Sequence, residues 1–549
     1  MVFEAKTHTV PLMPPKAGEP PARNHLGEEI TNWGMPTKFY AELMDKDAMR
    51  EAIRDEVFYG SEELMRKNSD WVLDDATSEA FMSEYLGYED NKPRGERDFT
   101  FIVYGASGYT GQLTLEYICK HCDPTKVKFA LAGRTAHKVE AVKKKVFAEY
   151  EWKGVDPPVI GASLKDPQDV RRMVQRCDVM VNIAGPFMLT GAENLVEACL
   201  LFDTDYVDVN GEIPFTHKLL EYHEYAEKNN VMVVPNAAFA GGATDVLATY
   251  AVDKLAEIKG KRCNKCVGFV TSTGQLAPSG GTVATREAMA SAMRDHGHLM
   301  MDPFSLGGRI GDGKRPEDQD RELQKIAKAD MGMTVRAQRG FSARARSSPS
   351  VHVRLVCADL RTPRPHPSPR SPRIYTWAPS SSQGWVTPFM YSFFETRLVR
   401  RSNYLRKCAR GKSFGKGFNF RNHILVGSEK DAKAAAAASS SSKKQEEELE
   451  KAGKLFKQGE GEDAATRATA QNKYYFIAEA ADGERLKVRM SAGEAYEETG
   501  HMAVEVAICL ALHRDELEFK GGVLTPSMAG GEKLVENLHK TGMLFDVMG

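Results

Sequence analysis

Three glycines within residues 105–111, Gly-Ala-Ser-Gly-Tyr-Thr-Gly, form the clearest candidate ligand-binding motif of the sequence. They directly follow the apolar, β-rich run 99–104 and precede "QLTLEYICKH", whose apolar residues have roughly helical spacing. A strand, a tight glycine turn and a helix start aim free backbone N–H groups and a helix dipole at an anion. The residues that we expect to hold the phosphates of a dinucleotide are Gly105, Ser107, Gly108, Tyr109, Thr110 and Gly111.

Each glycine has its own expected role. Gly105 allows the tight turn, Gly108 allows a pyrophosphate to approach closely, and Gly111 allows the helix to pack closely. The spacing is Gly-x-x-Gly-x-x-Gly rather than the commoner Gly-x-Gly-x-x-Gly. The glycines therefore indicate dinucleotide binding only because a predicted strand precedes them and a predicted helix follows. The alternative is a structural turn that binds nothing.

The end of the second predicted strand indicates which dinucleotide is bound. A site that prefers NAD usually has Asp or Glu there, to accept a hydrogen bond from the ribose 2′-hydroxyl. The strand here ends in "LAGRT", where Arg134 and Thr135 offer a cation and a hydroxyl that suit a 2′-phosphate. The sequence therefore predicts NADP, although Arg134 could instead cap a helix.

Two later turns belong to the same predicted site, because ligands of such sheets bind outside the carboxyl ends of the strands. In "NIAGPF", Asn182, Gly185 and Pro186 are expected along the nicotinamide half of the cofactor. "DVNGE" (208–212) ends the following strand. Polar residues near this cleft could donate a proton, but a structural role suits each of them better, so the catalytic residue stays unassigned: Tyr206, Asp208, Asn210, Glu212, Asn236, Asp245 and Thr282.

Other chemistries find little support. Two Cys-x-x-Cys pairs, Cys119/Cys122 and Cys263/Cys266, could together hold zinc, but they lie far apart in the sequence and Cys119 falls on the apolar side of a helix. We therefore predict no metal site. The motifs of serine hydrolases, P-loop proteins and zincins are absent from the sequence.

Short apolar strands and helices alternate over residues 98–240, and they carry the residues of the predicted cofactor site. Such alternation predicts parallel βαβ units, hence an α/β fold with a Rossmann-type doubly wound parallel sheet. Residues 241–335 and 385–549 contain longer strand-like runs, such as 265–274 and 473–493, and a helix near 500–512. We predict that they form a second, α+β domain built on an antiparallel sheet.

Three segments fit neither domain. Residues 1–97 form an acidic, partly helical N-terminal extension, which could pack on the neighbouring domain or dock onto another protein. Residues 336–384 are rich in Arg, Pro and Ser, which predicts a disordered insertion, although a phosphate-gripping loop or a translated intron also fits. Residues 433–451 are a low-complexity linker.

Composition restricts the function classes. The 549 residues carry a formal net charge of −1, which gives no support for a nucleic-acid partner. Nine cysteines in so long a chain do not form a disulfide scaffold, so a reducing compartment is expected. The sequence shows neither a membrane-spanning run nor a signal peptide, and we expect an intracellular, soluble or peripheral protein of the cytoplasm or mitochondrion.

Several stretches together resemble the saccharopine dehydrogenase-like oxidoreductases, a group that includes the bacterial trans-acting enoyl reductases. They include "VYGASGYTG", "LAGR", "VNIAGPF", "YVDVNGE", "PSGGTVAT" and "GGVLTPSMAGGEKLVENLHKTG". The likeness covers roughly 98–300 and 385–549, in the family's order. It implies an NAD(P)-binding Rossmann domain, a second α+β domain and lipid-related reductions. Residues 237–245, "AAFAGGATD", depart from the family's "GFDSIPAD"-like run and keep only Phe239 and Asp245.

Three functions follow from these features. The first is an NADP(H)-dependent oxidoreductase that transfers hydride to a lipid-like enoyl or carbonyl substrate, alone or as a homo-oligomer. The second is a non-catalytic accessory subunit that keeps the nucleotide-binding fold and docks through residues 1–97. The third is a carbon–nitrogen dehydrogenase of the saccharopine type, which would need basic residues in the cleft for an amino-dicarboxylate.

Overall fold

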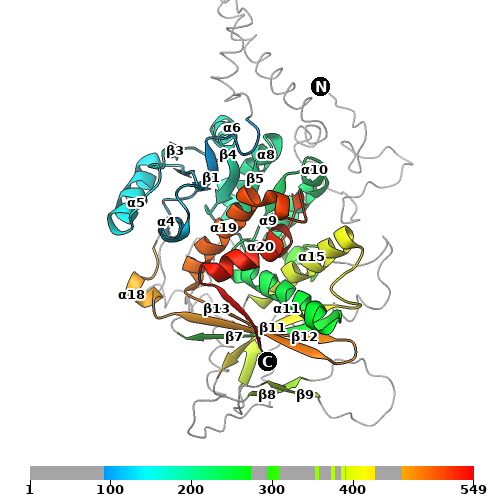
Figure 1. Ribbon diagram of the computed structural model, residues 1–549. Helices are drawn as coiled ribbons and strands as arrows, with labels where there is room; N and C mark the ends of the chain where they lie inside the picture. The colour runs from blue at the N-terminus through cyan, green and yellow to red at the C-terminus, as the bar shows by residue number, and fades with distance from the viewer. Residues whose placement is uncertain are drawn as a thin grey trace, which may run out of the picture.

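Two large β-sheets organise the described part of the chain (Figure 1). The computed structural model describes residues 92–273, 291, 294–307, 353–357, 373–377, 385–389, 391–426 and 460–548. Of the segments predicted above, residues 1–91 of the extension, Thr282 and the linker 433–451 lie outside the described residues.

The first sheet has seven strands in the order β14-β6-β5-β4-β1-β2-β3, and all its pairings are parallel. Its strands are β1 (Phe99–Tyr104), β2 (Phe129–Gly133), β3 (Val159–Gly161), β4 (Cys177–Asn182), β5 (Asp205–Asp208), β6 (Met232–Val234) and β14 (Gly522–Val523). The order 3-2-1-4-5-6 is that of the Rossmann fold. The predicted doubly wound parallel sheet is confirmed.

Helices lie between these strands and cover both faces of the sheet. They are α4 (Tyr109–His121), α5 (Ala136–Glu149), α6 (Pro167–Val174), α7 (Phe187–Thr190), α8 (Ala192–Leu201), α9 (Ile213–Leu219), the short η1 (Leu220–Tyr222) and α10 (His223–Lys228). In β1, Phe101 and Val103 enter one buried cluster while Ile102 and Tyr104 enter the other. Burial on both faces explains why this strand is almost continuously apolar.

The second sheet has six strands in the order β10-β11-β7-β12-β13-β15. They are β10 (Trp385–Pro388), β11 (Asn419–Val426), β7 (Cys263–Thr273), β12 (Gln471–Ala480), β13 (Arg485–Ala492) and β15 (Leu544–Met548). The pair β11–β7 is parallel and the other pairs are antiparallel, so the predicted antiparallel sheet is in fact mixed. Its helical partners include α11 (Thr244–Lys259), which packs on β7, β12 and β13, and α15 (Ser392–Arg410), which packs on β11.

The C-terminal part of the chain joins the two sheets. Its elements are α18 (Ala464–Arg467), α19 (Ala495–Leu512), η3 (Arg514–Glu516) and α20 (Pro526–Lys540). Helix α19 is the helix predicted near 500–512, and it packs on α4 so closely that a Cβ on Gly500 would lie 2.8 Å from Thr114 Oγ1. Strand β14 follows α19 and enters the parallel sheet beside β6.

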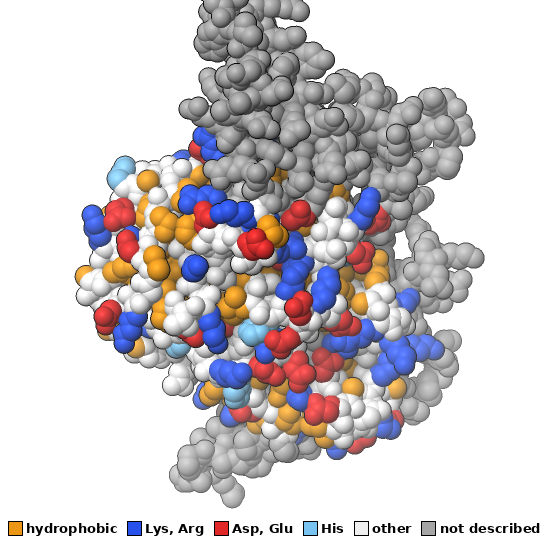
Figure 2. Space-filling view, turned by 45° about the horizontal axis from the view of Figure 1, so that its top comes forward, with side chains coloured by type: hydrophobic (Ala, Val, Ile, Leu, Met, Phe, Trp, Pro, Cys, Tyr) orange, Lys and Arg blue, Asp and Glu red, His pale blue; other side chains and the backbone are white. Residues whose placement is uncertain are grey.

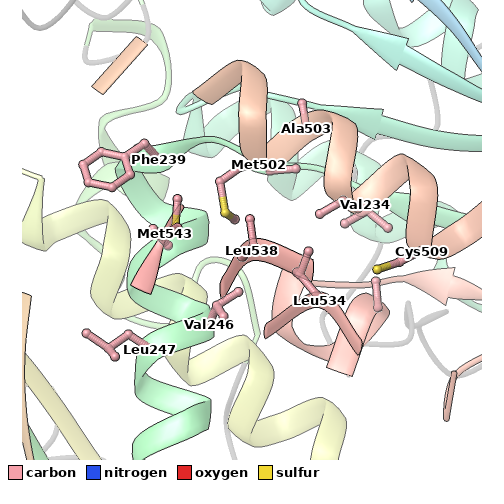
Figure 3. Close-up of a cluster of buried hydrophobic side chains, with 14 of the residues drawn as sticks. Val234, Phe239, Val246, Leu247, Met502, Ala503, Cys509, Leu534, Leu538 and Met543 are labelled. Atoms are coloured by element: carbon pink, nitrogen blue, oxygen red, sulfur yellow. The ribbon is translucent and has the colours of Figure 1, made fainter. Parts of the chain in front are cut away.

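A hydrophobic cluster fills the junction between the sheets (Figure 3). Val234 comes from β6, Val246 from α11, Met502 from α19 and Leu538 from α20, and each is at most 1% exposed. Because this cluster is continuous with the cores of both sheets, the two parts share one interior rather than meeting at a polar contact.

Within residues 336–384, the structure describes two short strands. Strands β8 (Val353–Cys357) and β9 (Arg373–Trp377) pair with each other in an antiparallel two-stranded sheet.

The surface of the described residues carries both signs of charge. Figure 2 shows Lys and Arg side chains interspersed with Asp and Glu over the visible face. Within the described ranges, no helix has the length and apolarity needed to cross a bilayer.

Candidate functional site

The glycine turn lies between β1 and α4, and two of its glycines are sterically required. Gly105 has φ +92°, and a Cβ there would lie 2.8 Å from the backbone nitrogen of Ala184. A Cβ on Gly111 would lie 2.5 Å from the carbonyl oxygen of Gly105. Any other residue at either position would push α4 or the turn after β4 out of place.

The start of α4 is open to a ligand. Gly108 is the N-cap residue and has no side chain to cap the helix. The N–H groups of a first helical turn have no acceptor within the helix, and the helix dipole makes this end positive. Ser107 is exposed and Gly108 is half-buried, so solvent reaches the turn. A helix start with these features is a common binding site for phosphate groups.

Tyr109 and Thr110 begin α4, but the Tyr109 side chain is held by the protein. Its hydroxyl donates to the carbonyl oxygen of Glu462 at 2.8 Å, and its ring meets Tyr496 edge-on at 5.6 Å between ring centroids. Burial raises the pKa of Tyr109 to about 12, so this hydroxyl stays protonated. Tyr109 therefore offers a ligand its backbone N–H, whereas its hydroxyl is already bonded.

Arg134 and Thr135 follow β2 at the same edge of the sheet, because Tyr104 of β1 pairs with Ala132 of β2. The Arg134 side chain is exposed, and Thr135 is the N-cap residue of α5. Gly133 packs against Val139, where a Cβ would lie 2.9 Å from a methyl group. The strand thus delivers an exposed cation, rather than a carboxylate, to the place beside the glycine turn.

The turns after β4 and β5 are bonded to each other. The Glu212 carboxylate accepts from the backbone N–H groups of Phe187, at 2.7 Å, and Met188, at 2.9 Å. Asn182 is fully buried, and its amide donates to the Tyr206 hydroxyl at 3.1 Å. Gly185 and Pro186, joined by a cis peptide bond, are half-buried between these contacts.

A second buried network fixes the loops that follow β5 and β6. One oxygen of Asp208 accepts from the Asn210 backbone at 2.9 Å, the Asn210 amide at 2.7 Å and the Asn236 backbone at 3.0 Å. Burial raises the Asp208 pKa to about 6. The Asn236 amide in turn donates to the Asn210 carbonyl at 2.9 Å. These contacts give Asp208, Asn210 and Asn236 a positioning role.

Asp245 lies away from the turns, among α11, α15 and α20. It accepts from the Ser402 hydroxyl and, at 2.9 Å, from the Ser527 backbone N–H. Burial raises its pKa to about 6. Its contacts tie three helices together, which is a structural role.

Sequence reasoning missed Glu395 on α15. This carboxyl group is fully buried, accepts from the Asn422 amide, and has its pKa raised to about 7 by burial. The neighbouring Phe394 ring presses on Gly241, where a Cβ would lie 2.4 Å from a ring carbon. The available signal was an acid inside the otherwise apolar run "YSFFE".

Three of the four cysteines of the two Cys-x-x-Cys pairs lie in the core, and Cys119 is partly buried. Cys122, Cys263 and Cys266 are buried, and burial raises the pKa of Cys263 to about 12. Among the residues that the structure describes, no group of three or more His, Cys, Asp or Glu side chains could hold a metal ion.

The sheet order, the glycine turn and the open helix start define a Rossmann-type dinucleotide-binding domain. Residues 101–234 match the family described as the saccharopine dehydrogenase NADP binding domain. This match confirms both the resemblance noted in the sequence and NADP as the cofactor.

The chain is also similar to whole proteins. It is 27% identical to a trans-acting enoyl reductase of Mycobacterium ulcerans over 462 residues, which are 82% of this chain and 97% of that relative. It is 26% identical to a trans-acting enoyl reductase of Mycobacterium bovis over 468 residues, 82% of this chain and 97% of the relative. Among solved structures, apo saccharopine dehydrogenase (L-Glu forming) from Saccharomyces cerevisiae aligns with 82% of this chain and 99% of its own, at 11% identity and a TM-score of 0.42.

Proposed function

We propose that the protein is an NADP(H)-dependent oxidoreductase that reduces an enoyl or carbonyl group of a lipid-like substrate. The open helix start at Gly108, inside a domain that matches NADP-binding relatives, carries the proposal. The names of the relatives, trans-acting enoyl reductases, support the enoyl substrate.

In this proposal, the turns at the carboxyl ends of the parallel strands bind different parts of the cofactor. The N–H groups at the start of α4 hold the pyrophosphate, and the exposed Arg134 and half-buried Thr135 hold the 2′-phosphate. Gly185 and Pro186 line the nicotinamide half, and the buried Asn182 holds their turn by accepting from the Ala184 backbone N–H at 3.0 Å. The Glu212 carboxylate keeps this last turn in place through two backbone hydrogen bonds.

When bound, NADPH supplies the hydride. The chain's own contribution is orientation, since the Asp208 and Glu212 networks hold the loops after β4, β5 and β6 in fixed relation to one another. Rigid loops lower the entropy that must be lost when a substrate is aligned with the cofactor.

The test is to supply purified protein with NADPH and a panel of enoyl and keto thioesters, and to follow loss of NADPH absorbance. We expect turnover with members of the panel and none with Gly105→Ala, whose added Cβ strains the turn. Gly297→Ala is the matched control, because its Cβ would meet nothing within 4 Å. Tight NADPH binding without turnover of any substrate would contradict the oxidoreductase and favour the accessory subunit.

A further inference from the structure

We propose that Arg467 is a positioning residue for the cofactor: it fastens residues 460–467 over Tyr109 and so presets the phosphate-binding turn. We call residues 460–467 the strap. The inference goes beyond the proposed function and uses only its cofactor site, because it does not depend on which substrate is reduced.

A single guanidinium group holds the strap to two helices. Arg467 Nε donates to Glu497 Oε1 of α19 at 2.6 Å, and Nη2 donates to Glu116 Oε2 of α4 at 3.2 Å. Its Nη1 donates to the backbone carbonyl of Glu462 at 2.9 Å. Arg467 is 5% exposed and Glu116 is 4% exposed, so the bond between them is shielded from water, whereas the Glu497 side chain is 39% exposed. Buried charge pairs with complete hydrogen bonding keep a defined geometry.

The Glu462 carbonyl connects this anchor to the glycine turn. It accepts from Arg467 and also from the Tyr109 hydroxyl, at 2.8 Å. The Tyr109 ring lies directly against Gly461, where a Cβ would come within 2.2 Å of two ring atoms. Figure 1 shows α18, the last turn of the strap, beside α4 at the edge of the second sheet. The strap therefore holds Tyr109, the residue after Gly108, by its side chain. The backbone N–H of Tyr109 remains at the start of α4.

Preorganisation is the physical consequence. A turn that already has its bound conformation loses less conformational freedom when the diphosphate arrives, and it therefore binds more tightly. Because the strap acts on the pyrophosphate subsite, it should affect NADPH and NADH alike, unlike a residue that reads the 2′-phosphate.

The experiment measures the Kd of both cofactors by fluorescence titration of the full-length protein and its variants. For Arg467→Ala we expect a rise of about tenfold in Kd for each cofactor. Arg467→Lys keeps the charge but lacks the fork of donors, and should restore part of the affinity. Arg485→Ala is the matched control, because Arg485 forms a comparable ion pair with Glu479, at 2.7 Å, in the β12–β13 hairpin.

Tyr109→Phe and Gly461→Ala test the same link without leaving Glu116 and Glu497 unpaired. Tyr109→Phe removes one hydroxyl, and we expect about a threefold rise in both Kd values at an unchanged melting temperature. Tyr250→Phe is its control, on a half-buried tyrosine of α11. Folded Arg467→Ala and Tyr109→Phe variants that bind both cofactors as the parent does would overturn the inference. A parent protein that binds neither cofactor would overturn the proposed function along with it.

Discussion

Replacing Arg134 with alanine should change which cofactor the protein prefers. Arg134 follows β2 directly and its side chain is exposed, with no carboxylate in the "GRTA" run. A hydrogen bond to a charged group contributes about 1.5–3 kcal/mol, and solvent around an exposed guanidinium favours the lower end. A loss of about 1.5 kcal/mol corresponds to about a tenfold weaker NADPH affinity. NADH has no 2′-phosphate, so its Kd should change less than about twofold.

The assay is a fluorescence titration of NADPH and NADH into the parent, Arg134→Ala and Lys138→Ala, an exposed cation one turn further along α5. Lys138→Ala should leave the ratio of the two Kd values unchanged. Equal weakening of NADPH and NADH by Arg134→Ala would refute the reasoning, because it would mean that Arg134 supports the fold or the pyrophosphate rather than reading the 2′-phosphate.

Three further predictions concern the scaffold. Gly111→Ala should lower the stability by about 1–3 kcal/mol, because its Cβ would meet backbone atoms of the turn, and it should weaken NADPH binding; an unchanged melting temperature would contradict this close packing. Burial, then Arg401, lowers the pKa of His223 to about 3, so the folded protein holds this imidazole neutral. The free energy of unfolding therefore falls as the pH drops below 6.5, the ordinary pKa of histidine. That loss amounts to about 2 kcal/mol at pH 5, and urea titrations should show it in the parent but not in His223→Gln. Leu538→Ala, at a fully buried site, should cost about 2–5 kcal/mol, whereas Leu544→Ala, 44% exposed, should cost far less; equal urea midpoints would refute the common core of Figure 3.

The parts of the fold that the sequence predicts are those specified locally. The run 99–104, the glycine turn and the apolar spacing of α4 are consecutive, so strand, turn and helix can each be inferred from neighbouring residues. The same holds for α6, where Asp166 caps the helix and Pro167 is its first residue.

Features formed by distant residues could not be predicted in this way. Strand β14 has two residues and joins the parallel sheet only because Val523 pairs with Val233. The parallel pairing of β11 with β7 likewise depends on packing between segments far apart in the chain.

The candidate site likewise contains residues that neighbouring sequence predicts and residues that only distant contacts define. Arg134 could be predicted from its position after a strand, whereas Glu395 and Arg467 gain their surroundings from tertiary contacts. Arg467 meets a carboxylate 351 residues away, and no local pattern marks it. Tyr109 could be predicted as a neighbour of the turn, but the partner of its hydroxyl could not.

A crystal structure of the protein with NADP bound would test the central claim most directly. We predict the pyrophosphate within hydrogen-bond distance of the N–H groups at the start of α4, and the 2′-phosphate against Arg134. A diphosphate bound elsewhere, with the turn at Gly108 left free, would contradict the account.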